Sequence, residues 1–219
     1  YTANFSEIEV SRRADADYFQ IPYRQIHCLL DSCRTVSLGQ LASISKGIEV
    51  GSKSYTKIGR LFIRVSNLKE CTIQEGGSDK YISESLYRAL RLFRPNQGDL
   101  LLTKDGTPGI CFAADEEVEG IVSGGIVRLR PFSDEIPREY LALAINSKAC
   151  RMQVEQECSG ALILHWKPSS IRKLRIPILA DEVMDEIAAL VSSSKEAMRE
   201  SERLLKEAKA RVEQLIEEA

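Results

Sequence analysis

The chain has 219 residues, with 30 Lys and Arg, 32 Asp and Glu, two His and a formal net charge of −2 at pH 7. This length suffices for one domain of about 180 residues and one long helix, so no disulfide or metal is needed to support a small core. A weakly acidic chain is not a general polyanion binder, and any nucleic-acid surface on it must be local.

Residues 1–35 are expected to form a lead-in segment and a short helix. Pro22 suits the first turn of that helix, and Ile26, Leu29 and Leu30 share one of its faces. Residues 36–180 are expected to form a β-rich domain of mixed α+β class, because their short apolar runs are broken by Gly, Asn and Pro. The expected strands are 61–65, 99–103, 110–113, 121–129 and 175–179, with turns at 76–77, 106–109 and 124–125, and the expected helical segments are 83–90, 137–145 and 169–174.

Residues 181–219 predict one long helix with a heptad pattern. With Met184 at position a, apolar or small residues occupy positions a and d for five heptads, without Pro or Gly. Such a seam is longer than a core helix needs, so we predict a coiled coil with a second helix. An amphipathic helix folded back on its own domain is the alternative. The residues expected to line the dimer seam are Met184, Ile187, Val191, Met198, Leu205, Ala208, Val212 and Leu215.

The sequence offers little for catalysis or metal binding. Six cysteines show no C-x-x-C spacing and the only histidines are His27 and His165, so no zinc site is expected. Segment 47–54 lacks the spacing of a phosphate loop, and no hydrolase, metalloprotease or amino-methyltransferase motif is found, so we expect no cofactor and no enzymatic activity. Unpaired cysteines without a signal peptide or long apolar run favour a reducing cytoplasm.

The segment 43–69 is predicted to be a flexible polar loop that contacts DNA. Its cations suit phosphates and its hydroxyl and amide groups suit base edges, although a merely solvated loop is the alternative. The basic stretches 80–104 and 148–175 add to it, because the body without the long helix keeps 24 basic against 21 acidic residues. Trp166 could stack on a base, or pack in the core as such residues more often do. The candidate DNA-binding residues are Lys46, Ser52, Lys53, Ser54, Tyr55, Lys57, Arg64, Asn67, Lys69, Lys104, Thr107, His165 and Lys167.

Several segments, in this order and spacing, carry a resemblance to a known family. They are RADADYFQIP at 13–22, FIRVSNL at 62–68, GDLLLTKDGTPG at 98–109, NSK at 146–148, SGA at 159–161, and LRIP at 174–177 before the long helix. With these motifs the chain resembles, over nearly its whole length, the specificity subunit of type I restriction-modification systems.

The resemblance implies a target recognition domain that reads one half of a bipartite duplex DNA site, joined to a long helix that sets the distance to a second such domain. Its partners would be DNA methyltransferase subunits and a restriction subunit, which carry out methylation and cleavage. The family's usual member has two domains and two long helices, so this chain is expected to be a half-subunit that dimerises or a fragment. The rival hypothesis is a non-enzymatic coiled-coil assembly module whose body binds protein.

Overall fold

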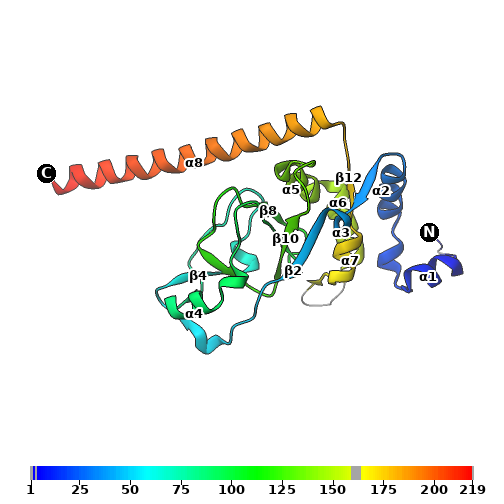
Figure 1. Cartoon of the computed structure of the whole chain (residues 1–219), viewed down its shortest axis with the longest axis horizontal. Coiled ribbons are helices and arrows are strands. Elements are labelled where there is room, and N and C mark those ends of the chain that lie inside the picture. Colours follow the sequence, from blue (N-terminus) through cyan, green and yellow to red (C-terminus); the bar gives the residue numbers. More distant parts are fainter. Residues whose placement is uncertain (1, 3, 159–163, 219) are drawn as a thin grey trace.

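The structure is a computed structural model that describes residue 2, residues 4–158 and residues 164–218. It is a mixed fold of helices and strands with a β-rich body and a long C-terminal helix, which confirms the predicted class (Figure 1). The SGA motif at 159–161 lies outside the described residues.

One four-stranded antiparallel sheet forms the centre of the body. Its middle strand β6 is buried along its whole length, and alternate side chains serve two different cores. Leu100 and Leu102 pack against the helices, whereas Leu101 on the opposite face packs against the second sheet. The strands in spatial order are β2 (Ala42–Lys46), β10 (Ile126–Pro131), β6 (Leu100–Thr103) and β8 (Cys111–Ala113).

A second sheet covers the other face of the first. Its strands β4 and β9 run parallel, and its remaining pairs are antiparallel. Leu61 and Ile63 of β4 contribute to the core shared with Leu101, whereas Phe62 faces a separate cluster with Ile82. In spatial order the strands are β3 (Tyr55–Thr56), β5 (Tyr81–Ile82), β4 (Arg60–Ile63) and β9 (Gly120–Val122), and α4 (Glu84–Ala89) follows β5.

Helices cover the remaining face of the central sheet, and α5 is fastened directly to strand β8. The Asn146 amide donates to the Cys111 carbonyl at 2.7 Å and accepts from the Cys111 N–H at 2.9 Å. These bonds satisfy an edge strand that would otherwise expose backbone groups. The helices and short strands on this side are α3 (Leu38–Leu41), α5 (Arg138–Asn146), α6 (Lys148–Glu157), α7 (Pro168–Lys173), and the β1 (Thr35–Ser37) and β12 (Arg175–Pro177) pair.

Three elements precede the body, namely α1 (Phe5–Ser11), the 3-10 helix η1 (Ala16–Phe19) and α2 (Ile21–Asp31). The predicted helix with Pro22 at its start is α2, and its buried residues are Ile26 and Leu30. The lead-in segment before it is itself helical at α1, which was not predicted. α1 buries no residue, so it lacks the apolar stripe by which helices are recognised.

The predicted strands agree with the observed ones except where a turn or partner strand decides the outcome. The predicted strand 121–129 is two strands, β9 and β10, separated at Gly124 and Gly125. The segment 43–69 is only partly a loop, because residues 43–46 lie in β2 and pair with β10. Short strands of this kind form because a neighbouring strand accepts their hydrogen bonds, which local sequence does not encode.

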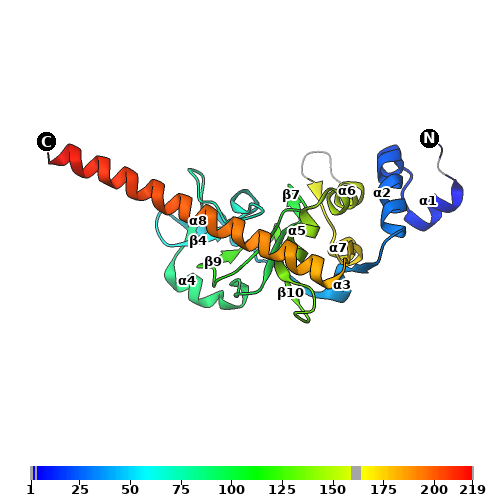
Figure 2. The ribbon, with the colours of Figure 1, turned by 90° about the horizontal axis from the view of Figure 1, so that it is seen from above.

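The long helix α8 (Asp181–Glu217) packs on the body with its first half and projects beyond it with its second half (Figures 1 and 2). Met184 and Ala188 are buried in the main core, and Ile187 packs against it. From Arg199 to Glu218 every residue is exposed. The expected seam is therefore divided: Met184 and Ile187 are used by the chain's own core, which corrects their assignment to a dimer interface.

The contact between α8 and the body ends with two ion pairs to Asp115, the first of them buried. Lys195 is only 4% exposed, and its Nζ donates to Asp115 Oδ1 at 2.8 Å and to the Ala113 carbonyl at 3.1 Å. Arg199, one turn later, donates to the other oxygen of Asp115 at 2.9 Å. Asp115 therefore fixes the direction in which α8 leaves the body.

Asp115→Ala should lower the free energy of unfolding by about 3 kcal/mol, because it leaves the buried Lys195 ammonium without its counter-charge. The matched control is Glu116→Ala, whose carboxylate is 74% exposed and meets Arg199 at 3.5 Å. It should change stability by less than about 0.5 kcal/mol. Urea unfolding measures both variants, and equal losses would contradict this role for Asp115.

Candidate nucleic-acid interface

The turn at residues 123–125 brings four separate segments together at one end of the central sheet. The Gly47 N–H donates to the Ile126 carbonyl at 3.1 Å, and the Ser123 N–H donates to the Ile63 carbonyl at 2.9 Å. The Lys104 N–H donates to the Gly125 carbonyl at 2.9 Å, and the Trp166 N–H donates to the Lys104 carbonyl at 2.8 Å. Strand ends and loops that meet in this way are the usual place for binding residues on a rigid scaffold.

The same contacts gather six of the candidate DNA-binding residues around this turn. Lys46 ends β2 beside it, and Arg64 follows β4. The short antiparallel pair β7 (Asp105–Gly106) and β11 (Leu164–His165) sets His165 opposite Asp105, with Thr107 following β7 and Lys167 following β11. The members of this group, which we call the turn cluster, are Lys46, Arg64, Lys104, Thr107, His165 and Lys167.

Asp105 organises the charges inside the turn cluster. It pairs with Lys104 Nζ and accepts from His165 Nδ1 at 2.9 Å. Burial alone would raise the pKa of Asp105, but the hydrogen bonds from Lys104 and His165 outweigh it and hold that pKa below its ordinary value. Because the pKa of Asp105 is lower in the folded than in the unfolded state, the ionised carboxylate stabilises the fold at any pH above its unfolded-state pKa. This stabilisation is lost as the pH falls through the folded-state pKa. The Asp105 carboxylate is therefore ionised at neutral pH, where it pairs with the Lys104 ammonium.

Residues 165–167, in the basic stretch 148–175, alternate between exposed and buried environments. Trp166 is 2% exposed and belongs to the main core, so it is the packing residue and not a base-stacking platform. The side chain of His165 is 60% exposed, and Lys167 is exposed as well. Of these three residues, only His165 and Lys167 can reach a ligand.

A second group of candidates lies on the other sheet. Ser52, Lys53 and Ser54 form a 3-10 helix, and Tyr55 begins β3, which pairs with β5. The Tyr55 ring packs 5.7 Å from the Phe62 ring, so it anchors the segment. Ser52, Lys53 and Lys57 are exposed beside it.

Two candidates have internal roles that remove them from a free binding surface. Asn67 is 2% exposed, accepts from the Arg64 N–H at 3.0 Å, and donates to Asp79 at 2.7 Å and to the Gln74 carbonyl at 3.1 Å. It holds the 64–79 loop together, so its side chain is engaged inside the protein and does not form part of the exposed surface where DNA contact was expected. Lys104 is 8% exposed and paired with Asp105, so it supplies charge to the cluster from beneath the surface.

Arg64 and Lys69 also differ from the expectation. Arg64 is half-buried and donates to the Ser78 carbonyl at 2.5 Å, so this hydrogen bond would compete with base contact. Lys69 is exposed but lies beside Glu70, whose carboxylate accepts from Arg151 at 3.0 Å. Within the second basic stretch, Arg94 stacks on Tyr87 at 3.7 Å from the ring centroid and is an internal residue.

The turn at 123–125 was not predicted as the organising element. Ser123 is 5% exposed and carries no charge, so composition offered no signal beyond the Gly124–Gly125 pair. Across the described part of the chain, no three His, Cys, Asp or Glu side chains are arranged to hold a metal ion. Within those same residues, no helix has the length and apolarity to cross a membrane.

Comparison with known structures finds proteins with a similar fold. The chain matches the S subunit of a type I restriction-modification system from M. genitalium with a TM-score of 0.56, 15% identity, and coverage of 79% of this chain and 41% of that one. It matches the HsdS subunit from Thermoanaerobacter tengcongensis with a TM-score of 0.51, 15% identity, and coverage of 90% and 49%. The chain has an S-subunit-like fold.

The S-subunit-like fold also occurs in a larger enzyme. The type IIG restriction endonuclease BpuSI matches with a TM-score of 0.59 and 10% identity over 87% of this chain, but over only 30% of the endonuclease. This chain spans less than half the length of each of these three proteins. No family model and no curated protein matches it.

The turn cluster can be tested through the close approach of Gly47 to the turn. A Cβ at Gly47 would lie 2.1 Å from the Ser123 carbonyl oxygen, so Gly47→Ala must separate the two segments and should destabilise the fold by roughly 1 to 3 kcal/mol. A Cβ at Gly51 meets nothing within 4 Å, so Gly51→Ala should be neutral or slightly stabilising. Urea unfolding and amide exchange at Ile48 measure the effect. Equal stability of the two variants would contradict it.

Proposed function

We propose that this chain is a DNA-recognition module that reads one half of a bipartite duplex site. The S-subunit-like fold supports DNA recognition as the class of function, and the turn cluster supports the position of the DNA-binding surface. Exposed cations and hydroxyl groups lie at strand ends and loops, where phosphate contacts position the protein and base contacts specify the sequence. The single observation that carries the proposal is the network of backbone hydrogen bonds around the 123–125 turn, which joins the segments that carry Lys46, Thr107, His165 and Lys167.

Residues 36–180 would act as the target recognition domain, and the segment 52–57 would extend the contact along the duplex. We assign the chain recognition and not catalysis. Methyl transfer and strand cleavage would belong to partner methyltransferase and restriction subunits, as the family resemblance implies. Turnover by the isolated chain would contradict this division of labour.

We further propose that the projecting half of α8 pairs with a second copy or a second half-subunit. Leu205, Val212 and Leu215 are 60%, 58% and 53% exposed on this half, and Ala208 lies between them on the heptad seam. An apolar stripe of this length is typical of a helix that meets another helix. Val191 and Met198 are at the edge of the body, where a partner helix would complete the seam.

Binding to duplex DNA should weaken steeply as salt increases, because neutralised phosphates release counterions. Lys53→Ala should weaken binding to every sequence and reduce the salt slope by about one unit. The matched control is Lys206→Ala on the projecting half of α8, which should leave both unchanged. Fluorescence anisotropy over a salt series measures the slopes. A salt-independent interaction would favour the rival hypothesis of an apolar protein-binding module.

Leu205→Glu with Val212→Glu should convert the dimer to a monomer, because unpaired charge buried in a helix seam costs several kcal/mol. Ala210→Glu with Gln214→Glu adds the same charge to the same half of α8 outside the seam, and this control should remain dimeric. Sedimentation equilibrium gives the mass of each protein. A monomeric parent, or a control that dissociates equally, would contradict dimerisation through α8.

A further inference from the structure

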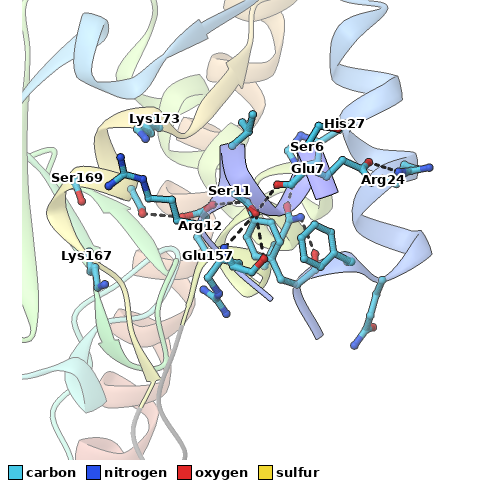
Figure 3. A pocket seen from close by; sticks show the side chains of 17 residues that line it. Ser6, Glu7, Ser11, Arg12, Arg24, His27, Glu157, Lys167, Ser169 and Lys173 are labelled. Atoms are coloured by element: carbon cyan, nitrogen blue, oxygen red, sulfur yellow. Dashed lines mark hydrogen bonds and ion pairs between the residues drawn. The ribbon is translucent and has the colours of Figure 1, made fainter. Parts of the chain in front are cut away.

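A cavity with charged, polar and apolar lining lies between the N-terminal elements and α6–α7, and it shares Lys167 with the turn cluster (Figure 3). Its volume of about 860 Å³ is within the range of small-ligand sites. Its lining is basic, with five cations against Glu7 and Glu157 in a chain whose formal net charge is −2. The lining cations are Arg12, Arg13, Arg24, Lys167 and Lys173.

Both acidic residues of this cavity already have partners. Glu157 accepts from Ser170 at 2.7 Å and from the Tyr18 hydroxyl at 3.2 Å. Burial and the neighbouring Glu157 raise the pKa of Tyr18 to about 12, so the hydroxyl keeps its proton at neutral pH. Glu7 pairs with Arg24. Both carboxylates are therefore engaged by groups other than the remaining cations.

Two of the five cations, Arg13 and Arg24, pair with carboxylates, and the other three do not pair with any described residue. Arg13 binds Asp15 through two nitrogens, both at 2.6 Å. For Arg12, Lys167 and Lys173 there is no ion pair with any residue that the structure describes. Figure 3 shows Arg12 extending from the end of α1 toward α7, which carries Ser169 and Lys173. A guanidinium, two ammonium groups and a hydroxyl around one cavity form a donor set suited to a phosphate group.

The backbone at Arg12 gives a second, independent indication. It has φ 54° and ψ 32°, and it is the one residue other than glycine with positive φ in the described part of the chain. It caps α1 by donating its N–H to the Ile8 carbonyl at 2.8 Å. Glycine is usual at this position, and the left-handed conformation costs an L-residue about 1 to 2 kcal/mol. A strained residue whose side chain has no internal partner among the described residues is characteristic of a binding site.

We propose that this cavity binds a phosphate group through Arg12, Lys167 and Lys173. The donor is either the backbone of duplex DNA that extends past the half-site or a free phosphorylated ligand. The pocket shares Lys167 with the turn cluster, whereas Arg12 and Lys173 belong to the pocket alone, so variants at these two residues test the pocket by itself. Phosphate binding is therefore separable from sequence recognition.

Titration of the whole chain with inorganic pyrophosphate tests the pocket directly. The double variant Arg12→Gly with Lys173→Gln removes two cations, and the glycine relieves the backbone at position 12 so that α1 is preserved. Pyrophosphate affinity should fall by at least about tenfold, because each charge-assisted hydrogen bond contributes more than a kcal/mol. The matched control, Lys206→Gln with Arg211→Gln on the projecting half of α8, carries the same charge change and should bind as the parent does. Calorimetry at low ionic strength measures all three proteins.

The proposal is overturned if the parent does not bind pyrophosphate, or if the double variant binds it as tightly as the parent and the control. A competition arm identifies the source of the phosphate. If duplex DNA displaces pyrophosphate and the double variant has a DNA salt slope lower by about two units, the ligand is the DNA backbone. If DNA binds without displacing pyrophosphate, the ligand is a free phosphate. Pyrophosphate binding with no DNA binding would contradict the recognition function and leave the pocket supported.

Discussion

The apolar stripe of α8 extends beyond the part of the helix that packs on the body. This difference in length determines which apolar residues of α8 are buried in the core and which are exposed. The first half of the stripe is satisfied internally, where Met184 and Ala188 enter the main core. The ion pair between Lys195 and Asp115 lies near the end of this contact. Because Lys195 is only 4% exposed, loss of its partner would leave a buried charge at a large cost in free energy. Beyond Arg199 the helix is a rigid arm about 30 Å long, at 1.5 Å per residue, with Leu205 and Val212 still exposed.

The turn at residues 123–125 is held by backbone hydrogen bonds and not by charged side chains. The turn donates from Ser123 to the end of β4 and accepts at Gly125 from the residue after β6, and the adjacent Ile126 accepts from Gly47 after β2. Loops of unrelated sequence therefore meet there. This arrangement separates scaffold from surface. Asn67 and Lys104 stabilise the loops from within, while Lys46 and Lys167 remain exposed. Loop residues can change on such a scaffold without loss of the fold, which suits the proposed function of DNA recognition.

Periodicity allowed much of this fold to be predicted. The heptad pattern indicated α8 from Asp181 onward, and short apolar runs indicated β4, β6, β8 and β12 to within a few residues, because both signals are local. Long-range partners were not predictable. Nothing near Asn67 in sequence shows that its amide binds Gln74 and Asp79, and nothing near Met184 separates a core contact from a dimer seam. The candidate DNA-binding residues were therefore predicted from basic charge and loop position alone. Only the structure shows which of these residues are exposed and which are internal.

The central claim is that this S-subunit-like chain reads DNA sequence, and selection from a pool of random duplexes tests it most directly. The whole chain is incubated with the pool at moderate salt, and the retained duplexes are sequenced over successive rounds. We predict enrichment of one common half-site, repeated in inverted orientation at a fixed spacing when the α8 arms pair. Retained duplexes that share no common sequence, or a pool that is not retained at all, would contradict it.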